Sequence, residues 1–311
     1  MQSGISQENL AAELVKDLIK EKRSEKRWRN IRFFIGLLLI LTIIGLAFSG
    51  GKPTQLSPGT GTHYISLIRL QGMIGPDEDF SSENVIPILE AAFKDKESQG
   101  VILNINSGGG TPVQASIIHD AILSLKQKYQ KKIIVVGEDM LASGAYFVAV
   151  AADKIYTNPN TITGSIGVVM KGFGFPEVMQ KIGIERRVYK AGIEKDRLDP
   201  FLPQNAADIE KIDQVIGEVH QNFINVVMQG RKNKLTAPPE KIFTGDFWSG
   251  ESALKLGLID GLGNLRGIMQ AEFHVDRFKD YSPRQSVIKT IMGSTLNTFL
   301  GETSRMKVLY Q

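Results

Sequence analysis

From residue 64 onward the chain alternates short apolar runs with amphipathic stretches. Continuous apolar runs bounded by turn residues predict buried strands, and apolar residues spaced three and four apart predict helices. The predicted strands are Tyr64–Ile74, Val101–Asn106, Ile133–Gly137, Lys154–Thr157 and Arg187–Lys190. The predicted helices are Asn84–Phe93, Pro112–Leu125, Ser143–Ala152, Ile209–Val226 and Val287–Leu300. This strand–helix–strand order predicts an α/β fold with right-handed βαβ crossovers.

One segment before this domain has a different pattern. Phe33–Gly51 contains nineteen residues and no charged side chain. As a helix it would be about 28 Å long, which is close to the thickness of a bilayer's hydrocarbon core. The stretch Leu18–Arg32 on its N-terminal side holds seven Lys or Arg and two Asp or Glu, whereas the other flank offers only Lys52 before Arg69. Basic residues favour the cytoplasmic side, so we expect one transmembrane helix with the N-terminus in the cytoplasm.

Two other interpretations of the uncharged segment compete with a retained anchor. A cleaved signal peptide is possible because Ala47-Phe48-Ser49 resembles a small-x-small cleavage site. The preceding stretch of 32 residues and the length of the apolar run favour a retained anchor instead. A buried core helix would need polar residues that this segment lacks. The body of the protein is therefore expected on the periplasmic or extracytoplasmic side of a bacterial inner membrane.

Composition excludes several classes of protein. The chain of 311 residues has no Cys, which removes disulfides, Cys-type zinc sites, Fe–S clusters and cysteine proteases. Only four His are present, at 63, 119, 220 and 274, so we expect no metal site and no cofactor. Residues 1–32 hold eight of the 37 basic and five of the 33 acidic residues, and the rest of the chain is close to neutral. The net charge of +4 therefore fits a membrane flank, and no nucleic-acid partner is expected.

Two loops could carry chemistry, because each follows a buried strand and opens a helix, where sites form in α/β sheets. The first, Asn106–Pro112, contains Gly108, Gly109 and Gly110. Successive glycines let backbone N–H groups approach a ligand closely, as in an oxyanion hole or a phosphate cradle. The spacing is not that of a P-loop. A tight strand-to-helix turn is the structural alternative.

The second loop, Asp139–Tyr146, places Ser143 at the start of a helix of small residues. Free N–H groups and the helix dipole there favour a developing negative charge. Ser143 is thus a candidate nucleophile, and an ordinary N-cap serine is the alternative.

A nucleophilic serine needs a base. The four His lie outside the Gly-rich loops and are expected to be structural or surface residues. Lys190 and Lys195 follow a predicted strand, and either could serve. A lysine that acts as a base near neutral pH must lose about three pKa units by burial, which corresponds to about 4 kcal/mol. Thr163–Gly167 is a third small polar cluster, which could supply a hydroxyl that orients an amine or could be a turn.

Together these segments resemble the signal peptide peptidase A (SppA) family of serine proteases in its short, single-unit form. The resemblance covers about residues 62–270. It rests on five segments in order, which are Asn106–Gly110, Met140–Ala149, Ala152–Tyr156 with Thr163–Val168, Gly192–Asp196, and Phe243–Gly245 with Gly250–Asp260.

The resemblance implies a Ser–Lys dyad on a Clp/crotonase-like fold of βαβ units in a superhelix. Ser143 would be the nucleophile, and Lys195, which occupies the motif's lysine, would be the base. Ser165 would orient the lysine amine. The backbone N–H of Gly144, with that of Gly109 or Gly110, would form the oxyanion hole. Family members form membrane-anchored homo-oligomers and cleave hydrophobic peptides such as remnant signal peptides.

With this resemblance the chain divides into five parts. They are a cytoplasmic basic segment (1–32), a transmembrane anchor (33–51), a linker (52–61), a serine protease domain (62–284) and a C-terminal helix and tail (285–311). Gly108 stands where the family has Pro, and Ala145 and Phe147 stand where it has Gly and Tyr, so the subsites are expected to differ in shape. Because the chain has a single catalytic unit, a complete site could need a neighbouring subunit.

Three alternatives to a signal peptide peptidase remain at this stage. The first is a related protease of the SohB or stomatin-associated type, which would cleave a specific membrane or envelope protein. The second is a non-catalytic anchored scaffold of the same fold, which would have no need of Ser143, Lys195 and Ser165 together. The third is a crotonase-like enzyme acting on an acyl-CoA, which an extracytoplasmic domain would not meet.

Overall fold

The computed structural model describes residues 16, 20, 22, 25–42 and 63–283. Contacts divide the chain into two units, residues 54–285 and a second unit made of 1–53 and 286–311. Residues 25–42 are helical. No helix within the described residues is both long and apolar enough to span a membrane. The predicted anchor, 33–51, continues past residue 42 and so lies partly outside the described residues, as do all of the linker 52–61 and the predicted helix Val287–Leu300.

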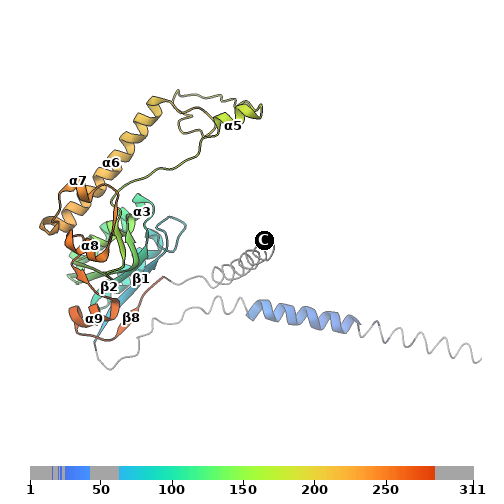
Figure 1. Ribbon diagram of the computed structural model, residues 1–311. Coiled ribbons are helices and arrows are strands. Elements are labelled where there is room, and N and C mark those ends of the chain that lie inside the picture. The colour runs from blue at the N-terminus through green and yellow to red at the C-terminus, as the bar shows by residue number, and fades with distance from the viewer. Residues whose placement is uncertain (1–15, 17–19, 21, 23–24, 43–62, 284–311) are drawn as a thin grey trace, which may run out of the picture. The chain divides into compact units, whose positions relative to one another are not determined.

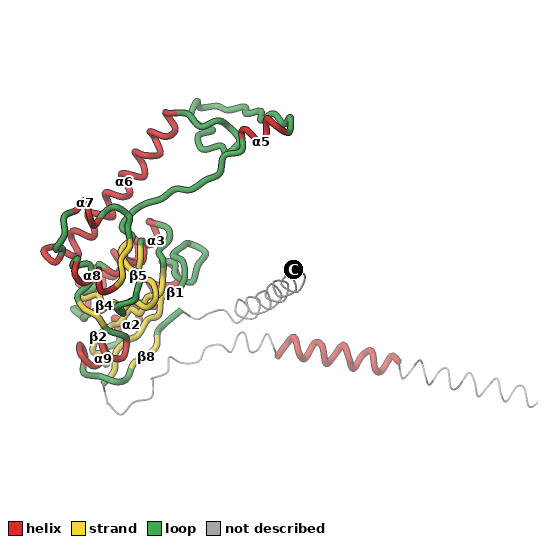
Figure 2. Tube along the Cα trace, viewed as in Figure 1, coloured by secondary structure: helices red, strands yellow, loops and turns green. Residues whose placement is uncertain are grey.

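The larger unit is built on an eight-stranded, mostly parallel sheet (Figures 1 and 2). Its main path runs β6-β5-β3-β2-β1-β8, and β4 pairs with β3 and with β7. The only antiparallel pair in the sheet is β5 with β6. The strands are β1 (Tyr64–Gln71), β2 (Ser98–Ser107), β3 (Ile133–Ala142), β4 (Lys154–Thr157), β5 (Ile162–Gly164), β6 (Phe247–Ser249), β7 (Gly261–Leu262) and β8 (Phe278–Asp280). The predicted α/β fold class is therefore confirmed.

Helices cover both faces of the sheet, which is why its central strands read as continuous apolar runs. The described helices are α2 (Ser82–Lys94), α3 (Pro112–Tyr129), α4 (Gly144–Ala149), α5 (Pro176–Lys181), α6 (Ala206–Arg231), the 3₁₀ turn η1 (Lys232–Lys234), α7 (Pro239–Ile242), α8 (Gly250–Lys255) and α9 (Leu265–Phe273). One apolar core joins Leu103 and Ile105 of β2 to α2, α3, α4 and the C-terminal half of α6. A second core joins Ile102 of β2 to α9.

Helix starts follow from local sequence. Side-chain oxygens of Ser81, Asn205 and Asn264 each accept a hydrogen bond from a backbone N–H in the first turn of α2, α6 and α9. Such caps satisfy amides that have no partner within the helix and contribute about 1 kcal/mol each. Pro112 occupies the first turn of α3 after Thr111, whose side chain makes no cap hydrogen bond.

The predicted strand Arg187–Lys190 is wrong. These residues form no strand and lie in an extended arm between β5 and α6, which projects from the sheet in Figure 1. Along the arm apolar side chains face solvent, and Tyr189 is 93% exposed. A strand needs a neighbour to satisfy its backbone groups, and the arm has none within the described chain. The arm comprises residues 167–205.

Candidate active site

Ser143 lies at the junction between β3 and α4, and its backbone conformation is unusual. Its φ of 52° and ψ of −125° lie outside the regions that non-glycine residues favour. The residue is half-buried. Although Ser143 occupies the N-cap position of α4, its side chain makes no cap hydrogen bond. The capping alternative considered from the sequence therefore does not account for this serine.

The glycine loop after β2 packs directly against this junction. A Cβ on Gly109 would lie 2.7 Å from the backbone nitrogen of Gly144 and 2.7 Å from Cβ of Ser143. Gly109 also has a φ of +103°. A Cβ on Gly110 would lie 2.0 Å from the carbonyl oxygen of Ile74. Both positions thus require glycine, and the two strand-end loops predicted from the sequence meet here.

The two candidate oxyanion-hole glycines differ in their hydrogen bonds. Gly109 N–H donates to Oγ of Ser107 at 3.1 Å and is already occupied. Gly110 N–H makes no hydrogen bond to another residue in the described part of the chain. Its nitrogen would lie 3.2 Å from a Cβ built on Gly144. Of the two glycines left open by the sequence, Gly110 is therefore the better partner for the Gly144 N–H, which starts α4.

Ser165 leaves the sheet beside Ser143. β3 and β5 are parallel, and their last residues, Ala142 and Gly164, are register partners. Ser143 N–H donates to the carbonyl oxygen of Gly164 at 2.8 Å. Ser165 has a φ of 51°, and its N–H donates to the carbonyl oxygen of Asp246 at 2.8 Å. The structure thus brings together five of the six predicted site residues, Ser143, Gly144, Gly109, Gly110 and Ser165.

A small cavity of about 150 Å³ opens beside Ser143. It is lined by Gly110 and Gly144 and by apolar side chains of α3, α4, α6 and the start of the arm. These include Phe147, Val168 and Phe223. A largely apolar cavity next to a candidate nucleophile suits a hydrophobic side chain of a substrate.

Lys195 is the predicted site residue that the chain does not bring to Ser143. It lies on the arm, its side chain is exposed, and it does not line the cavity beside Ser143. Lys190 is also on the arm, where its Nζ donates to the carbonyl oxygen of Ile193 at 2.6 Å and forms an ion pair with Asp196. The ion pair with Lys190 lowers the pKa of Asp196. Lys190 is thus engaged locally, while Lys195 is presented to solvent.

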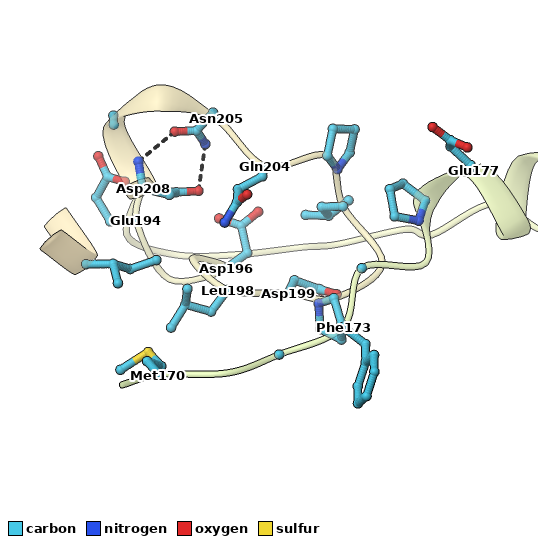
Figure 3. A pocket seen from close by; sticks show the side chains of 18 of the residues that line it. Met170, Phe173, Glu177, Glu194, Asp196, Leu198, Asp199, Gln204, Asn205 and Asp208 are labelled. Carbon is cyan, nitrogen blue, oxygen red and sulfur yellow. Dashed lines mark hydrogen bonds between the residues drawn. The ribbon is translucent and has the colours of Figure 1, made fainter. Parts of the chain in front are cut away.

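The arm and the start of α6 enclose a separate cavity of about 920 Å³ (Figure 3). Its lining includes the acidic residues Glu194, Asp196, Asp199 and Asp208 and the apolar residues Phe173 and Leu198. The labelled Asn205 and Asp208 hold the start of α6 through two hydrogen bonds, of 2.9 and 2.7 Å. This cavity does not include Ser143 or Lys195.

The histidines take the structural roles expected from the sequence. His119 is buried, its Nδ1 lies 2.9 Å from Oδ1 of Asp120, and its ring packs edge-on against Phe147. His220 Nε2 lies 3.1 Å from the carbonyl oxygen of Ile166. None of the four lines the cavity beside Ser143. Among the described residues no group of three or more metal-binding side chains converges.

The sequence did not identify the residues whose hydrogen bonds hold the glycine loop and α4 in place. Ser107 fixes Gly109, and Ile74 accepts from Thr111 N–H at 2.9 Å while donating to the carbonyl of Gly109 at 2.9 Å. Tyr146 anchors α4 from the core, since its hydroxyl donates to the carbonyl oxygen of Leu258 at 2.6 Å. Burial raises the pKa of Tyr146, so its hydroxyl stays protonated. The available sequence signal for Ser107 was its position between a buried strand and three glycines.

Comparisons with known proteins point to a family of peptidases. The family described as "Peptidase family S49" matches residues 125–273. The chain is 45% identical over 214 residues to the Na(+)/H(+) antiporter NhaA of Brucella abortus, covering 67% of this chain and 29% of that protein. It is 30% identical over 269 residues to Protease 4 of Haemophilus influenzae, covering 81% of this chain and 42% of that protein. The chain therefore spans less than half of the length of either relative.

A solved structure, that of a membrane-bound stomatin-specific protease, matches 68% of this chain at 14% identity with a TM-score of 0.43. The assignment of the family rests on the sequence matches instead. The matched region 125–273 contains Ser143, Ser165 and Lys195. The chain thus belongs to peptidase family S49, and the resemblance to SppA serine proteases that its five motifs predicted is confirmed.

Proposed function

We propose that this chain is a membrane-anchored serine endopeptidase that cleaves hydrophobic peptides, with Ser143 as nucleophile and Lys195 as general base. The observation that carries the proposal is the position of Ser143, whose strained backbone and uncapped side chain lie between two N–H groups and an apolar cavity. Strained backbone at a site of this kind is typical of a positioned catalytic group. Membership of peptidase family S49 supports the reaction class.

In the proposed reaction Oγ of Ser143 attacks the carbonyl carbon of the scissile bond while the neutral amine of Lys195 takes the hydroxyl proton. The resulting oxyanion receives hydrogen bonds from the N–H groups of Gly144 and Gly110. The Lys195 ammonium then protonates the leaving amine, and the C–N bond breaks to give an ester on Ser143. Water hydrolyses this ester in a second round, with Lys195 again as the base.

Lys195 would reach Ser143 from a second copy of the chain. In a single chain its side chain is exposed, so nothing there removes the solvent that keeps a lysine charged. The exposed apolar side chains of the arm, such as Phe173 and Ile193, suit burial against a neighbouring copy. A homo-oligomer with the Clp/crotonase-like arrangement would thus complete the dyad between subunits.

The membrane anchor is part of this proposal. It rests on the uncharged segment 33–51 and its basic N-terminal flank. Hydrophobic peptides such as remnant signal peptides would be present at this location, and the apolar cavity beside Ser143 would receive their side chains.

The test is labelling of the full-length chain, purified in detergent, with a fluorophosphonate, followed by peptide mass spectrometry. We expect label on Ser143, loss of label and of peptide hydrolysis in Ser143→Ala and Lys195→Ala, and retention of both in the matched control Lys190→Ala. Mixing the two inactive variants during assembly should restore part of the activity if the dyad forms between copies. Retained turnover in Lys195→Ala would disprove the dyad, and an unlabelled, folded oligomer would favour the scaffold.

Substrate profiling separates the two protease alternatives. We expect the wild-type chain to cleave a range of peptides with hydrophobic residues at the cleavage site. Cleavage confined to one membrane or envelope protein would favour the SohB or stomatin-associated type of function instead. The Ser143→Ala variant is the control for contaminating proteases.

A further inference from the structure

We infer that a third cavity, lined in part by polar and charged side chains, binds a small zwitterion that carries an ammonium and a carboxylate group, such as an amino acid or a dipeptide. This cavity, here called the α9-face cavity, lies over the middle and C-terminal parts of β2 and β3 and beyond the end of β4, and its volume is about 530 Å³. Its polar lining is Asn104, Glu138, Asp139, Asn158, Asn160, Thr161, Asn264 and Arg266. The inference does not depend on the proposed protease activity.

The α9-face cavity and the candidate active site lie on opposite faces of the sheet. Asn104 shares its face of β2 with Ile102, which packs in the core beneath α9. Leu103 and Ile105 point to the other face, toward the core that contains α4. Because side chains alternate along a strand, Asn104 is directed away from Ser143. Ligands of parallel sheets bind near the carboxyl ends of the strands, and this cavity reaches that side of the sheet beyond the end of β4.

The floor of the cavity contains an acceptor without a donor. Asn104 is 2% exposed, and its Nδ2 donates to the carbonyl oxygen of Val136 at 3.2 Å. Its Oδ1 is buried and has no hydrogen-bond partner among the described residues. An unsatisfied buried polar atom costs stability, and in native proteins such atoms are nearly always paired. A ligand with a hydrogen-bond donor would satisfy Oδ1 of Asn104.

The charges that line the cavity are separated onto two walls. Glu138 and Asp139 are in the second half of β3, whereas Arg266 is in the first turn of α9. Within the described part of the chain none of the three forms an ion pair. The N-terminus of α9 adds partial positive charge on the Arg266 side. This arrangement complements an ammonium near Asn104 and Glu138 and a carboxylate near Arg266.

Hydrogen bonds within the protein hold the walls of the cavity in place, so the walls do not need a bound ligand to form. Thr161 Oγ1 donates to the carbonyl oxygen of Glu138 and accepts from Asn158 N–H at 3.0 Å. Asn264 Oδ1 caps α9 by accepting from Gly267 N–H at 3.0 Å. A preformed cavity of this size is within the range that small molecules occupy. The separation of its charges excludes a simple cation, since Arg266 and the helix terminus would repel it.

The inference is tested by calorimetric titration of the full-length chain, in detergent, with alanyl-alanine. N-acetyl-alanyl-alanine lacks the ammonium and alanyl-alanine amide lacks the carboxylate. We expect saturable binding of alanyl-alanine and at least about tenfold weaker binding of each blocked compound, because a hydrogen bond to a charged group contributes about 1.5–3 kcal/mol. Glu138→Gln and Arg266→Met should weaken binding of alanyl-alanine by a similar factor, and the matched surface control Lys255→Met should not.

Asn104→Leu provides a second readout, in thermal unfolding. Without ligand this variant should unfold at a temperature no more than a few degrees below wild type, because the unpaired oxygen is removed along with one hydrogen bond. It should also lose the upward shift that alanyl-alanine gives to the wild type. Three results would overturn the inference: no saturable binding at millimolar concentrations, equal binding of the blocked compounds, or unchanged binding in both Glu138→Gln and Arg266→Met.

Discussion

The backbone N–H of Ser143 donates a 2.8 Å hydrogen bond to the carbonyl oxygen of Gly164. This bond continues the pairing of β3 with β5 by one residue, so that Ser143 and Ser165 leave the sheet as neighbours, both with positive φ. The position of the nucleophile is therefore fixed by the strand that carries Ser165. A change at residue 165 can act through its hydroxyl or through this backbone, and the two effects can be separated.

Removal of the Ser165 hydroxyl should lower kcat and leave KM unchanged, because a positioning residue orients the lysine without contacting substrate. We expect a loss of about 10²-fold in kcat, the lower end of the range for general acid–base catalysis. Ser165→Gly and Ser165→Ala should lose the same factor, as both remove the hydroxyl while only glycine relieves the backbone at φ 51°. Steady-state kinetics of peptide hydrolysis separate the effect on kcat from the effect on KM. A much larger loss in the glycine variant would show that backbone geometry is the main contribution.

The close approach of the glycine loop to Ser143 predicts a sharp effect of Gly109→Ala. The added Cβ would meet Gly144 N and Ser143 Cβ at 2.7 Å and would displace the nucleophile. We expect about a 10²-fold loss of peptide hydrolysis, as an ångström of misplacement can cause. Gly72→Ala is the matched control, because Gly72 also has a positive φ (+85°) but has open space around its Cβ. Equal losses in both variants would contradict the proposed geometry.

Glu272 predicts how stability falls in acid. Burial would raise the pKa of this carboxyl, but hydrogen bonds from Lys132, Lys154 and Tyr156 outweigh burial and lower it to about 2. A depressed pKa stabilises the folded state above the pKa of the unfolded chain, about 4.5, and this stabilisation is lost as pH falls toward 2. The Glu272 side chain is 11% exposed, and its contribution is on the order of 2–3 kcal/mol.

Urea unfolding at several pH values checks this expectation. Glu272→Gln should be less stable than wild type at pH 7, and the difference should shrink between about pH 5 and pH 2. Glu251→Gln is a suitable control, since Glu251 pairs with Lys255 on the surface of α8 and its side chain is 62% exposed. If the difference in unfolding free energy between wild type and Glu272→Gln stayed constant with pH, it would rule out a link between the ionisation of Glu272 and stability.

The ion pair between Arg231 and Asp260 holds the C-terminal end of α6 against the sheet. Arg231 is 2% exposed, donates to the carbonyl oxygen of Gly257 at 2.8 and 2.9 Å, and donates to Asp260 at 2.7 Å. Arg231→Met leaves a buried carboxylate with one cation fewer, and we expect a loss of about 3–5 kcal/mol of unfolding free energy. Lys234→Met removes an exposed partner of the same carboxylate and should cost less than about 1 kcal/mol. Denaturant titration compares the two, and similar losses would contradict a buried role for Arg231.

The central strands and the meeting of two loops could be predicted from sequence because both follow from local patterns. Ile133–Gly137 is a continuous apolar run, and strands that are parallel neighbours bring their carboxyl ends to one edge of the sheet. That rule predicted that the glycine loop and the Ser143 loop would converge, without any knowledge of the structure. The identity of the occupied glycine amide could not be predicted, since it depends on the Ser107 side chain.

The errors and omissions have physical reasons as well. Arg187–Lys190 has β-forming residues but no neighbouring strand, and periodicity alone does not report on pairing. Strands β5 to β8 have two or three residues each, too few for an alternating pattern to be recognised. The position of Lys195 depends on where the arm goes, which is a long-range property. The unpaired oxygen of Asn104 likewise becomes visible only once β2 and β3 are side by side.

The parallel pairing of β8 with β1 has a consequence for biogenesis. β1 is the first strand to be synthesised, and Ile65, Ser66 and Leu67 find their partners only at Phe278, Lys279 and Asp280. The outer edge of β1 therefore stays open until more than two hundred further residues have left the ribosome. Until Phe278–Asp280 are available, the sheet cannot be completed at this edge. An open strand edge can pair with another chain, so the last strand of the sheet also protects the first.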